Sequence, residues 1–396
     1  MSAYPLTMLN QQLDYARYHS RFYSRQLSGY ALPLASCESL SALPFTEVED
    51  LQNHGAEMLC VGADKVERIV TLNSSGSGGA PKRLFFTRRD LARTVEFFST
   101  GMNAMCGAGD GVSIFMPANA ENSIARLLAE GLEYFGAQPY VFGLIQDYPK
   151  AVEALYQVKP HTIVGVPSQM RKLALLTPAL RPQNILLTAD YIADAAKKTI
   201  TKMWHCAIFE HYGLTESGYG GAVECPAHDG MHIRHDELVL EVIEPNGTRP
   251  VAEGQWGEIV LTTLRREAMP LIRYRTGDMG RLIRRPCACG SELPRLDRIR
   301  GRLSEIAREV NIYHVDEILY AINEVLDYSA SCKEGILTIT LETVNAGCSD
   351  YCKARLAQTW PDLSIRVIPV PATAAGVTPT ATKAERNRKR TIDWRV

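Results

Sequence analysis

Between Val66 and Leu264, short apolar runs alternate with amphipathic stretches, and this alternation constrains the fold more than any other feature. Residues 111–117, 161–167, 184–190 and 206–213 form apolar runs of strand length. The stretches between them, including 123–136, 168–176 and 192–204, have helical periodicity. Strands separated by helices are typical of a parallel sheet covered on both faces. The pattern therefore predicts an α/β protein with mostly parallel sheets and helices.

The pattern changes after Arg265. Residues 254–264 and 271–283 have the character of antiparallel strands joined by tight glycine turns. From Leu303 onward a smaller unit follows, with an expected helix at 314–325, strand at 334–344, helix at 348–360 and strand at 364–370. We therefore expect a large N-terminal domain (residues 1–302) that includes a small β-rich part, and a small α+β C-terminal domain (residues 303–396).

Composition excludes several functional classes. The 396-residue chain is 46% hydrophobic, and its 43 Lys+Arg nearly balance its 44 Asp+Glu, so no global field attracts nucleic acid or membrane. The basic cluster that begins at Lys383 is short, and we interpret it as a solvated face. No apolar stretch has the length of a membrane span, and the start of the chain lacks a signal-like pattern. We expect a cytoplasmic protein whose ten cysteines are mostly buried thiols, with a few that bind metal.

A glycine- and serine-rich segment follows the apolar run ERIVTL. It is formed by Ser74, Ser75, Gly76, Ser77, Gly78 and Gly79, with Lys82 close behind. Successive backbone N–H groups in such a turn form a concave anion site, and glycine lets the backbone approach a phosphate closely. The segment does not match the Walker A pattern. A phosphate-binding loop and a plain surface turn are both compatible with this segment taken alone.

Other segments favour the phosphate interpretation. In HYGLTES, Thr215 and Glu216 follow an apolar strand, and a hydroxyl with a carboxylate suits a phosphate oxygen and a Mg²⁺ ion. Asp278 lies in a glycine-flanked turn, where a carboxylate can accept two ribose hydroxyls. Arg302 lies at the join to the small C-terminal unit, and Lys383 lies in a polar loop near the end of the chain.

Together these segments resemble the adenylate-forming superfamily of acyl- and aryl-CoA ligases, and most closely its phenylacetate–CoA ligase branch. The segments SSGSGGAPK, YGLTES, GQWGEIVLTTLRREAMPLIRYRTGDMGRL and CACG occur in that branch's order. The resemblance implies that ATP and a carboxylic acid give an acyl-adenylate and pyrophosphate. A thiol, expected to be coenzyme A, then displaces AMP. Catalysis of this kind depends on positioning and on neutralising phosphate charge.

The resemblance also implies roles for individual residues. Residues 74–79 and Lys82 match the loop that holds the β- and γ-phosphates. Thr215 matches the α-phosphate contact and Glu216 the magnesium ligand. The adenine base is expected between two segments, Ala189, Asp190 and Tyr191 on one side and Glu210, His211 and Tyr212 on the other. Asp278 and Arg302 match the ribose contacts.

Lys383 matches the lysine that bridges the attacking carboxylate and the α-phosphate. In the family, the C-terminal domain swings about a hinge and withdraws this lysine between the two half-reactions. Ser304 occupies the hinge position, where the family usually has Asp or Lys. The resemblance thus implies that the C-terminal domain is mobile and that Lys383, Glu216 and Thr215 are catalytic.

The chain departs from the family pattern at several places, and these departures leave alternatives open. The loop has G-S-G-G where G-T-T-G is usual, the adenine segment is T-A-D-Y instead of G-A-E-P, and the segment FMPANAENS differs from the phenylacetate enzymes. The expected substrate is therefore a small, aromatic or other, carboxylic acid. The acceptor is coenzyme A or, alternatively, the thiol of an acyl-carrier protein, and a reaction that stops at nucleotidyl transfer is another alternative. A catalytically degenerate nucleotide-binding regulator is the alternative from a different class. For oligomeric state we expect a homodimer.

Cysteines and histidines in two distant segments suggest a metal site. The first segment contains Cys225 and His232, with His228 and His235 as spare candidates, and the second contains Cys287 and Cys289. A Cys-x-Cys-Gly knuckle can present two thiolates to one ion, and Cys225 with His232 would complete a tetrahedral Cys₃His site for structural Zn²⁺. Unligated residues in a loop-rich region are the alternative.

Overall fold

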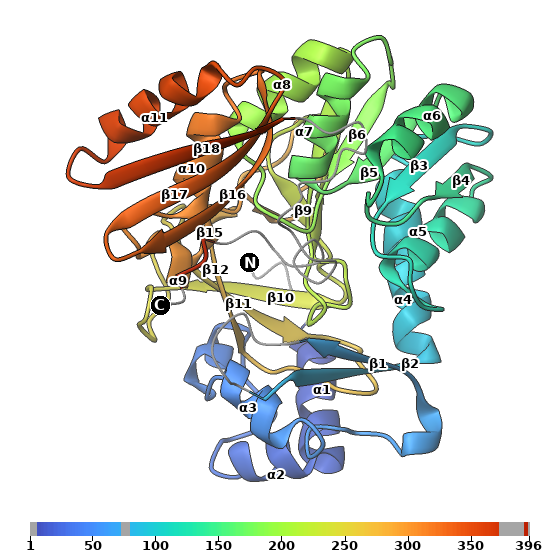
Figure 1. Cartoon of the computed structure of the whole chain (residues 1–396). Helices are drawn as coiled ribbons and strands as arrows, with labels where there is room; N and C mark the ends of the chain where they lie inside the picture. The colour runs from blue at the N-terminus through green and yellow to red at the C-terminus, as the bar shows by residue number, and fades with distance from the viewer. Residues whose placement is uncertain (1–5, 73–79, 372–391, 395–396) are drawn as a thin grey trace. The chain divides into compact units, whose positions relative to one another are not determined.

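A computed structural model of the chain describes residues 6–72, 80–371 and 392–394 (Figure 1). The chain divides into two compact units, each made of two segments. Unit 1 combines Met1–Ala104 with His211–Leu303, and unit 2 combines Met105–Glu210 with Ser304–Val396. The predicted domains, residues 1–302 and 303–396, stay a prediction, since these units are each built from two separate segments. A separately moving C-terminal domain stays a prediction.

Unit 2 contains the parallel sheet. Its strands lie in the order β4-β3-β5-β6-β7 and all pair in parallel. They are β3 (Gly111–Phe115), β4 (Gln138–Val141), β5 (Thr162–Gly165), β6 (Asn184–Leu187) and β7 (Ala207–Tyr212). Strand β7 belongs to unit 2 as far as Glu210, and its last two residues belong to unit 1. The intervening helices are α5 (Ile124–Glu133), α6 (Tyr148–Val158), α7 (Pro167–Leu176) and α8 (Asp194–Trp204). Every residue of β5 is buried, as expected for a strand covered on both faces. The predicted α/β fold class is confirmed.

The C-terminal part of unit 2 is a three-stranded sheet with two helices. Its elements are α10 (Ile312–Leu319), β16 (Val325–Lys333), β17 (Ile336–Thr343), α11 (Cys348–Thr359) and β18 (Ser364–Pro371). β17 pairs antiparallel with β16 and parallel with β18, so β17, α11 and β18 form a βαβ unit. The expected helix over 314–325 is wrong at its end, because α10 ends at Leu319 and strand β16 begins at Val325. Polar and apolar residues alternate along most of β16, a pattern that indicates a strand, and the expectation of a helix up to residue 325 overlooked it.

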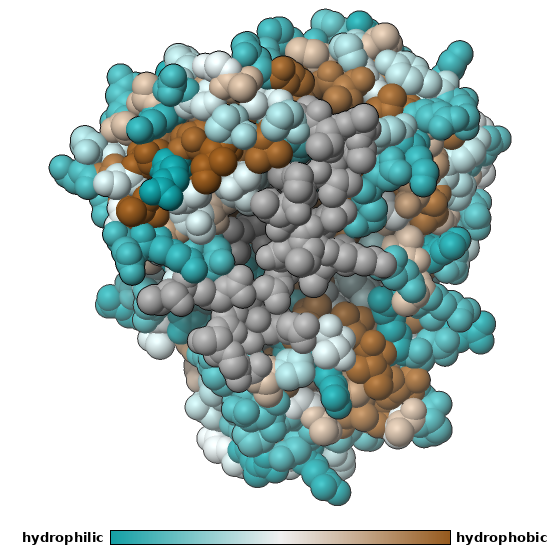
Figure 2. Space-filling model, viewed as in Figure 1, coloured by the Kyte–Doolittle hydropathy of each residue, from teal (hydrophilic) through white to brown (hydrophobic). Residues whose placement is uncertain are grey.

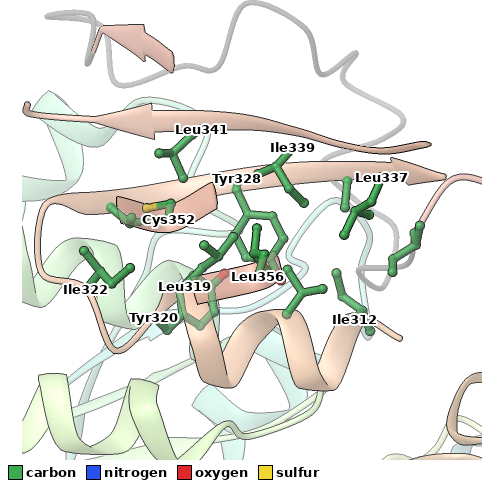
Figure 3. Packing of buried hydrophobic residues seen from close by; sticks show 14 of the residues in the cluster. Ile312, Leu319, Tyr320, Ile322, Tyr328, Leu337, Ile339, Leu341, Cys352 and Leu356 are labelled. Carbon is green, nitrogen blue, oxygen red and sulfur yellow. The ribbon is translucent and has the colours of Figure 1, made fainter. Parts of the chain in front are cut away.

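The core of this part forms between one face of the sheet and the two helices. Leu337, Ile339 and Leu341 occupy alternate positions on β17 and are all fully buried. Figure 3 shows these side chains on the same side of the strand, close to Leu319 of α10 and Leu356 of α11. The buried Tyr328 hydroxyl donates to Asp316 Oδ1 over 2.7 Å, which satisfies both polar groups inside the core.

Two buried cations on α7 join this C-terminal part to the parallel sheet of the same unit. Arg171 is completely buried and donates to the carbonyl oxygens of Tyr320, Ile322 and Val325 over 3.1, 2.9 and 2.7 Å. Lys172 Nζ lies 2.7 Å from both carboxylate oxygens of Glu342, and the side chains of this pair are each only 2% exposed. A buried charge is costly unless it is paired, so these contacts favour one docking position.

Unit 1 is built from N-terminal helices and several small sheets. The helices are α1 (Leu6–His19), α2 (Arg21–Gln26), α3 (Val48–His54), α4 (Arg88–Met102) and α9 (Leu303–Ile306, which runs past the unit's end), with 3₁₀ turns at Glu38–Ala42 and Ala63–Lys65. Strands β1 (Val66–Leu72) and β2 (Lys82–Thr87) form an antiparallel pair. Strands β10 (Leu238–Ile243), β11 (Gly257–Thr263), β12 (Tyr274–Gly280) and β15 (Gly301–Arg302) form a 4-stranded antiparallel sheet. Strands β8 (Ala222–Glu224), β9 (Met231–Ile233), β13 (Leu282–Ile283) and β14 (Arg295–Leu296) pair in the order β13-β14-β9-β8, and β8 pairs with the end of β7.

On the face drawn in Figure 2, hydrophilic residues cover most of the area that is coloured by hydropathy, and hydrophobic residues form smaller groups among them. Among the helices of the described residues, none has both the length and the apolar character needed to cross a membrane.

The buried Lys172–Glu342 pair makes a testable contribution to stability. Replacing Glu342 by Gln leaves a buried ammonium without its counterion, and we expect unfolding to become easier by about 3–5 kcal/mol. Lys172→Met combined with Glu342→Leu removes both charges and is expected to recover most of that loss. Urea unfolding followed by tryptophan fluorescence measures both effects, since Trp204 and Trp360 are buried in unit 2.

A surface ion pair provides the matched control. Arg249 and Glu244 are 3.0 Å apart, with side chains 79% and 42% exposed. Arg249→Ala is expected to change the free energy of unfolding by no more than about 1 kcal/mol. A Glu342→Gln variant as stable as this control would show that the buried pair does not hold the C-terminal part in place.

Candidate functional site

Two residues from separate segments of unit 1, Lys82 and Tyr274, contact the buried carboxylate of Glu216. Lys82 is the first residue of β2, and its ammonium forms an ion pair with Glu216 Oε1. The Tyr274 hydroxyl donates to the same Oε1 over 3.1 Å, and Lys82 Nζ lies 3.4 Å from the Tyr274 oxygen. The Glu216 side chain is only 5% exposed. The structure therefore brings together the cation that follows the glycine-rich segment and the carboxylate predicted to bind magnesium.

The loop that carries Glu216 has a defined shape. It connects β7 to β8 and includes Thr215, which is half-buried. The Ser217 hydroxyl accepts from the Leu214 N–H over 3.0 Å and donates to the Leu214 carbonyl over 3.0 Å. Two backbone bonds, Gly218 N to Thr215 O and Tyr219 N to Leu214 O, close the turn at 3.0 and 2.8 Å. These local hydrogen bonds hold the Thr215–Glu216 pair in place without help from a ligand.

The protonation states follow from these contacts. Burial alone would raise the pKa of Glu216, but the Lys82 ammonium outweighs burial and lowers this pKa below its usual value. Glu216 is therefore ionised at neutral pH. Burial and the adjacent Glu216 carboxylate raise the pKa of Tyr274, so its hydroxyl stays protonated and donates a hydrogen bond.

Asp278 and Arg302, the predicted ribose pair, also contact each other in unit 1. They face each other across β12 and β15, and Arg302 Nε lies 2.9 Å from Asp278 Oδ1. The Tyr212 hydroxyl donates to the other oxygen, Oδ2, over 3.0 Å. The register of β11 and β12 shifts here, and Gly277 has φ +71°, a conformation that favours glycine. Such a bulge re-aims the side chain that follows it.

Tyr274 is the contact that the sequence analysis missed. It lies in the same quoted segment as Asp278, and the two residues share one face of β12 together with Thr276 because side chains alternate along a strand. Once the segment was assigned to a strand, this alternation could have identified Tyr274 as a neighbour of the site.

The other predicted adenine contacts lie in unit 2. Ala189, Asp190 and Tyr191 directly follow β6, at the carboxyl edge of the parallel sheet, where α/β proteins bind ligands. Ala189 has φ +73°, an uncommon conformation for a residue with a side chain. The Tyr191 ring lies 4.5 Å from the Tyr313 ring, measured between centroids. Glu210 is paired with Lys197, whose Nζ lies 2.6 Å from Oε1.

His211 follows Glu210 on β7 and lies in unit 1. Its ring centroid is 6.0 Å from that of Phe97 and 6.4 Å from that of Phe98. Burial lowers the pKa of His211 to about 4, so the imidazole is neutral at pH 7. A neutral, aromatic-flanked ring is compatible with the predicted position beside a base.

Several predicted residues lie outside the described part of the chain. They are Ser74, Ser75, Gly76, Ser77, Gly78, Gly79 and Lys383. Ser304, the predicted hinge residue, is exposed in α9. The roles assigned to all of these residues stay predictions.

The predicted metal ligands converge in unit 1. Cys225, His232, Cys287 and Cys289 each place one ligand atom within 4.8 Å of the others. Cys225 Sγ lies 3.7 Å from Cys287 Sγ, and Cys289 Sγ lies 3.4 Å from His232 Nε2. The spare candidate His228 contacts Glu224 instead, with Nδ1 3.4 Å from Oε2.

Comparison with known proteins identifies the family. No family model matches the chain. The chain is 31% identical over 308 residues to a phenylacetate–coenzyme A ligase of Thermus thermophilus, a match that covers 74% of this chain and 68% of that enzyme. The chain belongs to the phenylacetate–coenzyme A ligase family. It is also 29% identical over 298 residues to the enzyme of Pseudomonas putida, covering 71% of this chain and 65% of that protein. The matches span about two thirds of each relative's length.

A solved structure shows the same fold over almost the whole chain. The crystal structure of a 2-hydroxyisobutyryl-CoA ligase in the postadenylation state, in complex with 2-HIB-AMP, superimposes with a TM-score of 0.82 and 21% identity. The match covers 98% of this chain and 89% of that one. This likeness shows that the chain has the fold of that ligase, while the family resemblance noted from the sequence motifs is confirmed by the phenylacetate–coenzyme A ligase relatives.

The depressed pKa of His211 predicts a specific pH dependence of stability. The unfolded chain takes up this proton near pH 6.5, whereas the folded protein takes it up only near pH 4. The stabilisation is therefore complete above about pH 6.5 and is lost as the pH falls toward 4, by up to about 3 kcal/mol. A His211→Phe variant lacks this pH-dependent contribution to stability.

Urea unfolding from about pH 7 down to about pH 4.5 tests this expectation. The difference in unfolding free energy between His211→Phe and the wild type should shift in favour of the variant as the pH falls. A His228→Phe variant, altered at the protein surface, is the control and should follow the wild type. A difference that stays constant with pH would contradict a buried neutral imidazole at position 211.

Proposed function

We propose that this protein uses ATP to activate a small carboxylic acid as its acyl-adenylate and then transfers the acyl group to coenzyme A. Membership of the phenylacetate–coenzyme A ligase family supports the reaction class. The observation that carries the proposal is the convergence in unit 1 of motif residues that are far apart in the sequence. Lys82 contacts Glu216, and Asp278 contacts both Tyr212 and Arg302.

The two half-reactions place distinct demands on the protein. A carboxylate is a poor electrophile because it carries negative charge and lacks a good leaving group. In the first step an oxygen of the acid attacks the α-phosphorus of ATP, and pyrophosphate leaves. In the second step the thiol sulfur attacks the acyl carbon, its proton is lost, and AMP leaves. Positioning and charge neutralisation supply most of the rate enhancement in phosphoryl chemistry of this kind.

The described residues suit these demands. Lys82 supplies a positive charge next to the glycine-rich segment, and Asp278, held by Arg302 and Tyr212, presents a buried carboxylate of the kind that accepts ribose hydroxyls. Arg302 also donates to the Thr276 carbonyl over 2.9 Å, which fixes its guanidinium. Thr215 offers a hydroxyl beside Glu216 for a phosphate oxygen.

Glu216 suits a magnesium ion, because it is a buried, ionised carboxylate and magnesium prefers hard oxygen ligands. When bound with ATP, magnesium would neutralise phosphate charge. The Tyr274 hydroxyl and the Lys82 ammonium both contact Oε1 and so restrict the orientation of the carboxylate. Tyr274 is thus a positioning residue for Glu216.

The finer assignments are also proposals. The departure in FMPANAENS favours an acid other than phenylacetate itself. We place the protein in the cytoplasm, where ATP and coenzyme A are available. We also expect a homodimer, because closed dimers are the commonest oligomers. The Cys225–His232–Cys287–Cys289 cluster has no role in this chemistry, and a zinc ion there is a separate proposal.

A pyrophosphate-release screen tests the proposed function. The purified protein is mixed with ATP, Mg²⁺ and single acids from a panel of aromatic and aliphatic carboxylic acids, with and without coenzyme A. We expect pyrophosphate release with a subset of the acids, and an acyl-CoA product, detected by mass spectrometry, only when coenzyme A is present. Release without thioester would instead support a carrier-protein acceptor or nucleotidyl transfer. Nucleotide binding without release for any acid would support the regulator.

Lys383 separates the two half-reactions. Lys383→Ala is expected to abolish pyrophosphate release and to spare thioester formation from a chemically supplied acyl-adenylate, because the lysine acts only on the attacking carboxylate and α-phosphate. Lys353→Ala, which alters an exposed lysine of α11, is the control and should leave both reactions unchanged. If Lys383→Ala retains both half-reactions, the assignment of this lysine is wrong.

Glu216 is tested through magnesium dependence. In Glu216→Gln we expect the Mg²⁺ concentration for half-maximal pyrophosphate release to rise by about tenfold, because a neutral amide binds a hard cation more weakly. The affinity of Glu216→Gln for Mg–ATP, measured by calorimetry, should fall in parallel. The surface variant Glu244→Gln is the control. An unchanged magnesium titration in Glu216→Gln would remove this residue from the metal-binding role.

A further inference from the structure

We propose that Cys225, His232, Cys287 and Cys289 bind one structural zinc ion that ties two loops of unit 1 together. The proposal is independent of the ligase reaction, because it rests on the geometry of residues that the ligase chemistry does not use. The ion itself, and a role for it in folding, go beyond family membership.

Two of the distances between the ligand atoms match those of a tetrahedral site, and all four atoms lie within 4.8 Å of one another. With Zn–S near 2.3 Å and Zn–N near 2.0 Å, tetrahedral geometry places two sulfurs about 3.8 Å apart and a sulfur and a nitrogen about 3.5 Å apart. Cys225 Sγ and Cys287 Sγ are 3.7 Å apart, and Cys289 Sγ and His232 Nε2 are 3.4 Å apart. A disulfide requires sulfurs separated by about 2.0 Å, so this arrangement matches a metal site better than a disulfide bond.

The backbone presents the two knuckle cysteines to a single point. Residues 287–290 form a tight turn in which Gly290 N donates to Cys287 O over 3.0 Å, and Cys287 N donates to Ser291 O over 2.9 Å. Gly290 has φ +90°, a conformation that residues with side chains rarely adopt. The turn therefore accounts for the glycine of the Cys-x-Cys-Gly knuckle.

The other two ligands come from the β8–β9 hairpin, one from its connection and one from β9. Cys225 directly follows β8, and its carbonyl accepts from His228 N over 3.0 Å in the turn that leads to β9. His232 is the middle residue of β9 and pairs in register with Arg295 of β14. A metal ion would thus join the β8–β9 connection to the β13–β14 connection. Closing these loops restricts the unfolded chain, and metal binding adds to folding stability.

A buried arginine next to the cluster holds the same two loops. Arg295 is completely buried, and its Nη1 lies 2.7 Å from Asp229 Oδ2 in the first loop. Its Nη2 donates to the Arg285 carbonyl over 2.8 Å in the second loop. Three thiolates and Zn²⁺ carry a net charge of −1, so a neighbouring guanidinium is electrostatically favourable. The loops are therefore prearranged, and supporting contacts of this kind are common around metal sites.

The site is closed, with four protein ligands and no position left for substrate. This is the arrangement of structural zinc sites, whereas catalytic sites keep an open position. Three sulfurs and one imidazole favour zinc over magnesium or calcium, which prefer oxygen ligands. We therefore assign the ion a role in folding and stability.

Metal analysis of the purified full-length chain tests the proposal. After dialysis against EDTA to remove loosely bound ions, elemental analysis should find about one zinc ion per chain in the wild type. His232→Ala and Cys289→Ser should retain less than about a tenth of this amount under the same dialysis. Cys289 is exposed, so its replacement by serine tests the ligand without disturbing a core.

Matched controls use the same residue types outside the cluster. His228→Ala removes the neighbouring histidine and Cys37→Ser removes another partly exposed cysteine, and both should keep the full zinc content. Wild-type protein stripped of zinc under denaturing conditions and refolded should melt several degrees lower than protein refolded with zinc. Cys289→Ser should melt at the same temperature with and without added zinc.

A spectroscopic readout separates ligation from a general loss of folding. Refolding with Co²⁺ in place of zinc should give the visible absorption of tetrahedral cobalt with thiolate ligands in the wild type and in His228→Ala, and not in His232→Ala. Wild-type protein without stoichiometric metal would overturn the proposal. So would equal zinc content in His232→Ala and His228→Ala, or a Cys225–Cys287 disulfide in protein kept under reducing conditions.

Discussion

The buried carboxylate of Glu216 places the strongest constraint on unit 1. A buried charge costs several kcal/mol unless a counterion or hydrogen bonds compensate it. Lys82 and Tyr274 provide that compensation, and they come from β2 and β12. Strands β2 and β12 therefore lie next to the loop that carries Glu216. The energetic requirement to neutralise Glu216 therefore helps to determine how unit 1 is assembled.

The same requirement recurs elsewhere in the chain. Asp278 is paired with Arg302, and Lys172 is paired with Glu342. In unit 1 the paired groups are those expected to contact a nucleotide, so their charges are positioned before any ligand binds. Such preorganisation lowers the cost of reorganising polar groups during reaction. In unit 2 the Lys172–Glu342 pair has no such role in our proposal and serves to dock the C-terminal sheet. Paired buried charges thus position ligand-binding groups in unit 1 and hold the C-terminal sheet in place in unit 2.

The metal cluster extends this principle to soft ligands. Thiols are weakly polar when protonated, so Cys225 and Cys287 can lie in contact without a metal, whereas three thiolates cannot lie so close without a cation. The β7–β8 connection leads into β8, and Cys225 of the cluster directly follows this strand. Only the three residues of β8 therefore separate the two in sequence. The neighbouring strands β9, β13 and β14 are also short, with three, two and two residues. A metal cross-link between their loops would add to the short ladders that join these strands.

The sequence by itself determined the α/β class and most of the strands, because apolar runs such as 161–167 are local patterns. It also located Glu216, Asp278 and the cysteine pairs, since each lies in a short distinctive segment. The end of α10 and the strand β16 were missed, although the alternation of polar and apolar residues along β16 is itself a local pattern of a strand. Tertiary structure alone decided that Tyr274 contacts Glu216 and that Arg171 anchors Tyr320, whereas His232 had already been preferred to His228 as the fourth metal ligand from the sequence. Those contacts depend on chain segments distant in sequence, whose meeting is set by the packing of the whole unit and not by any local pattern.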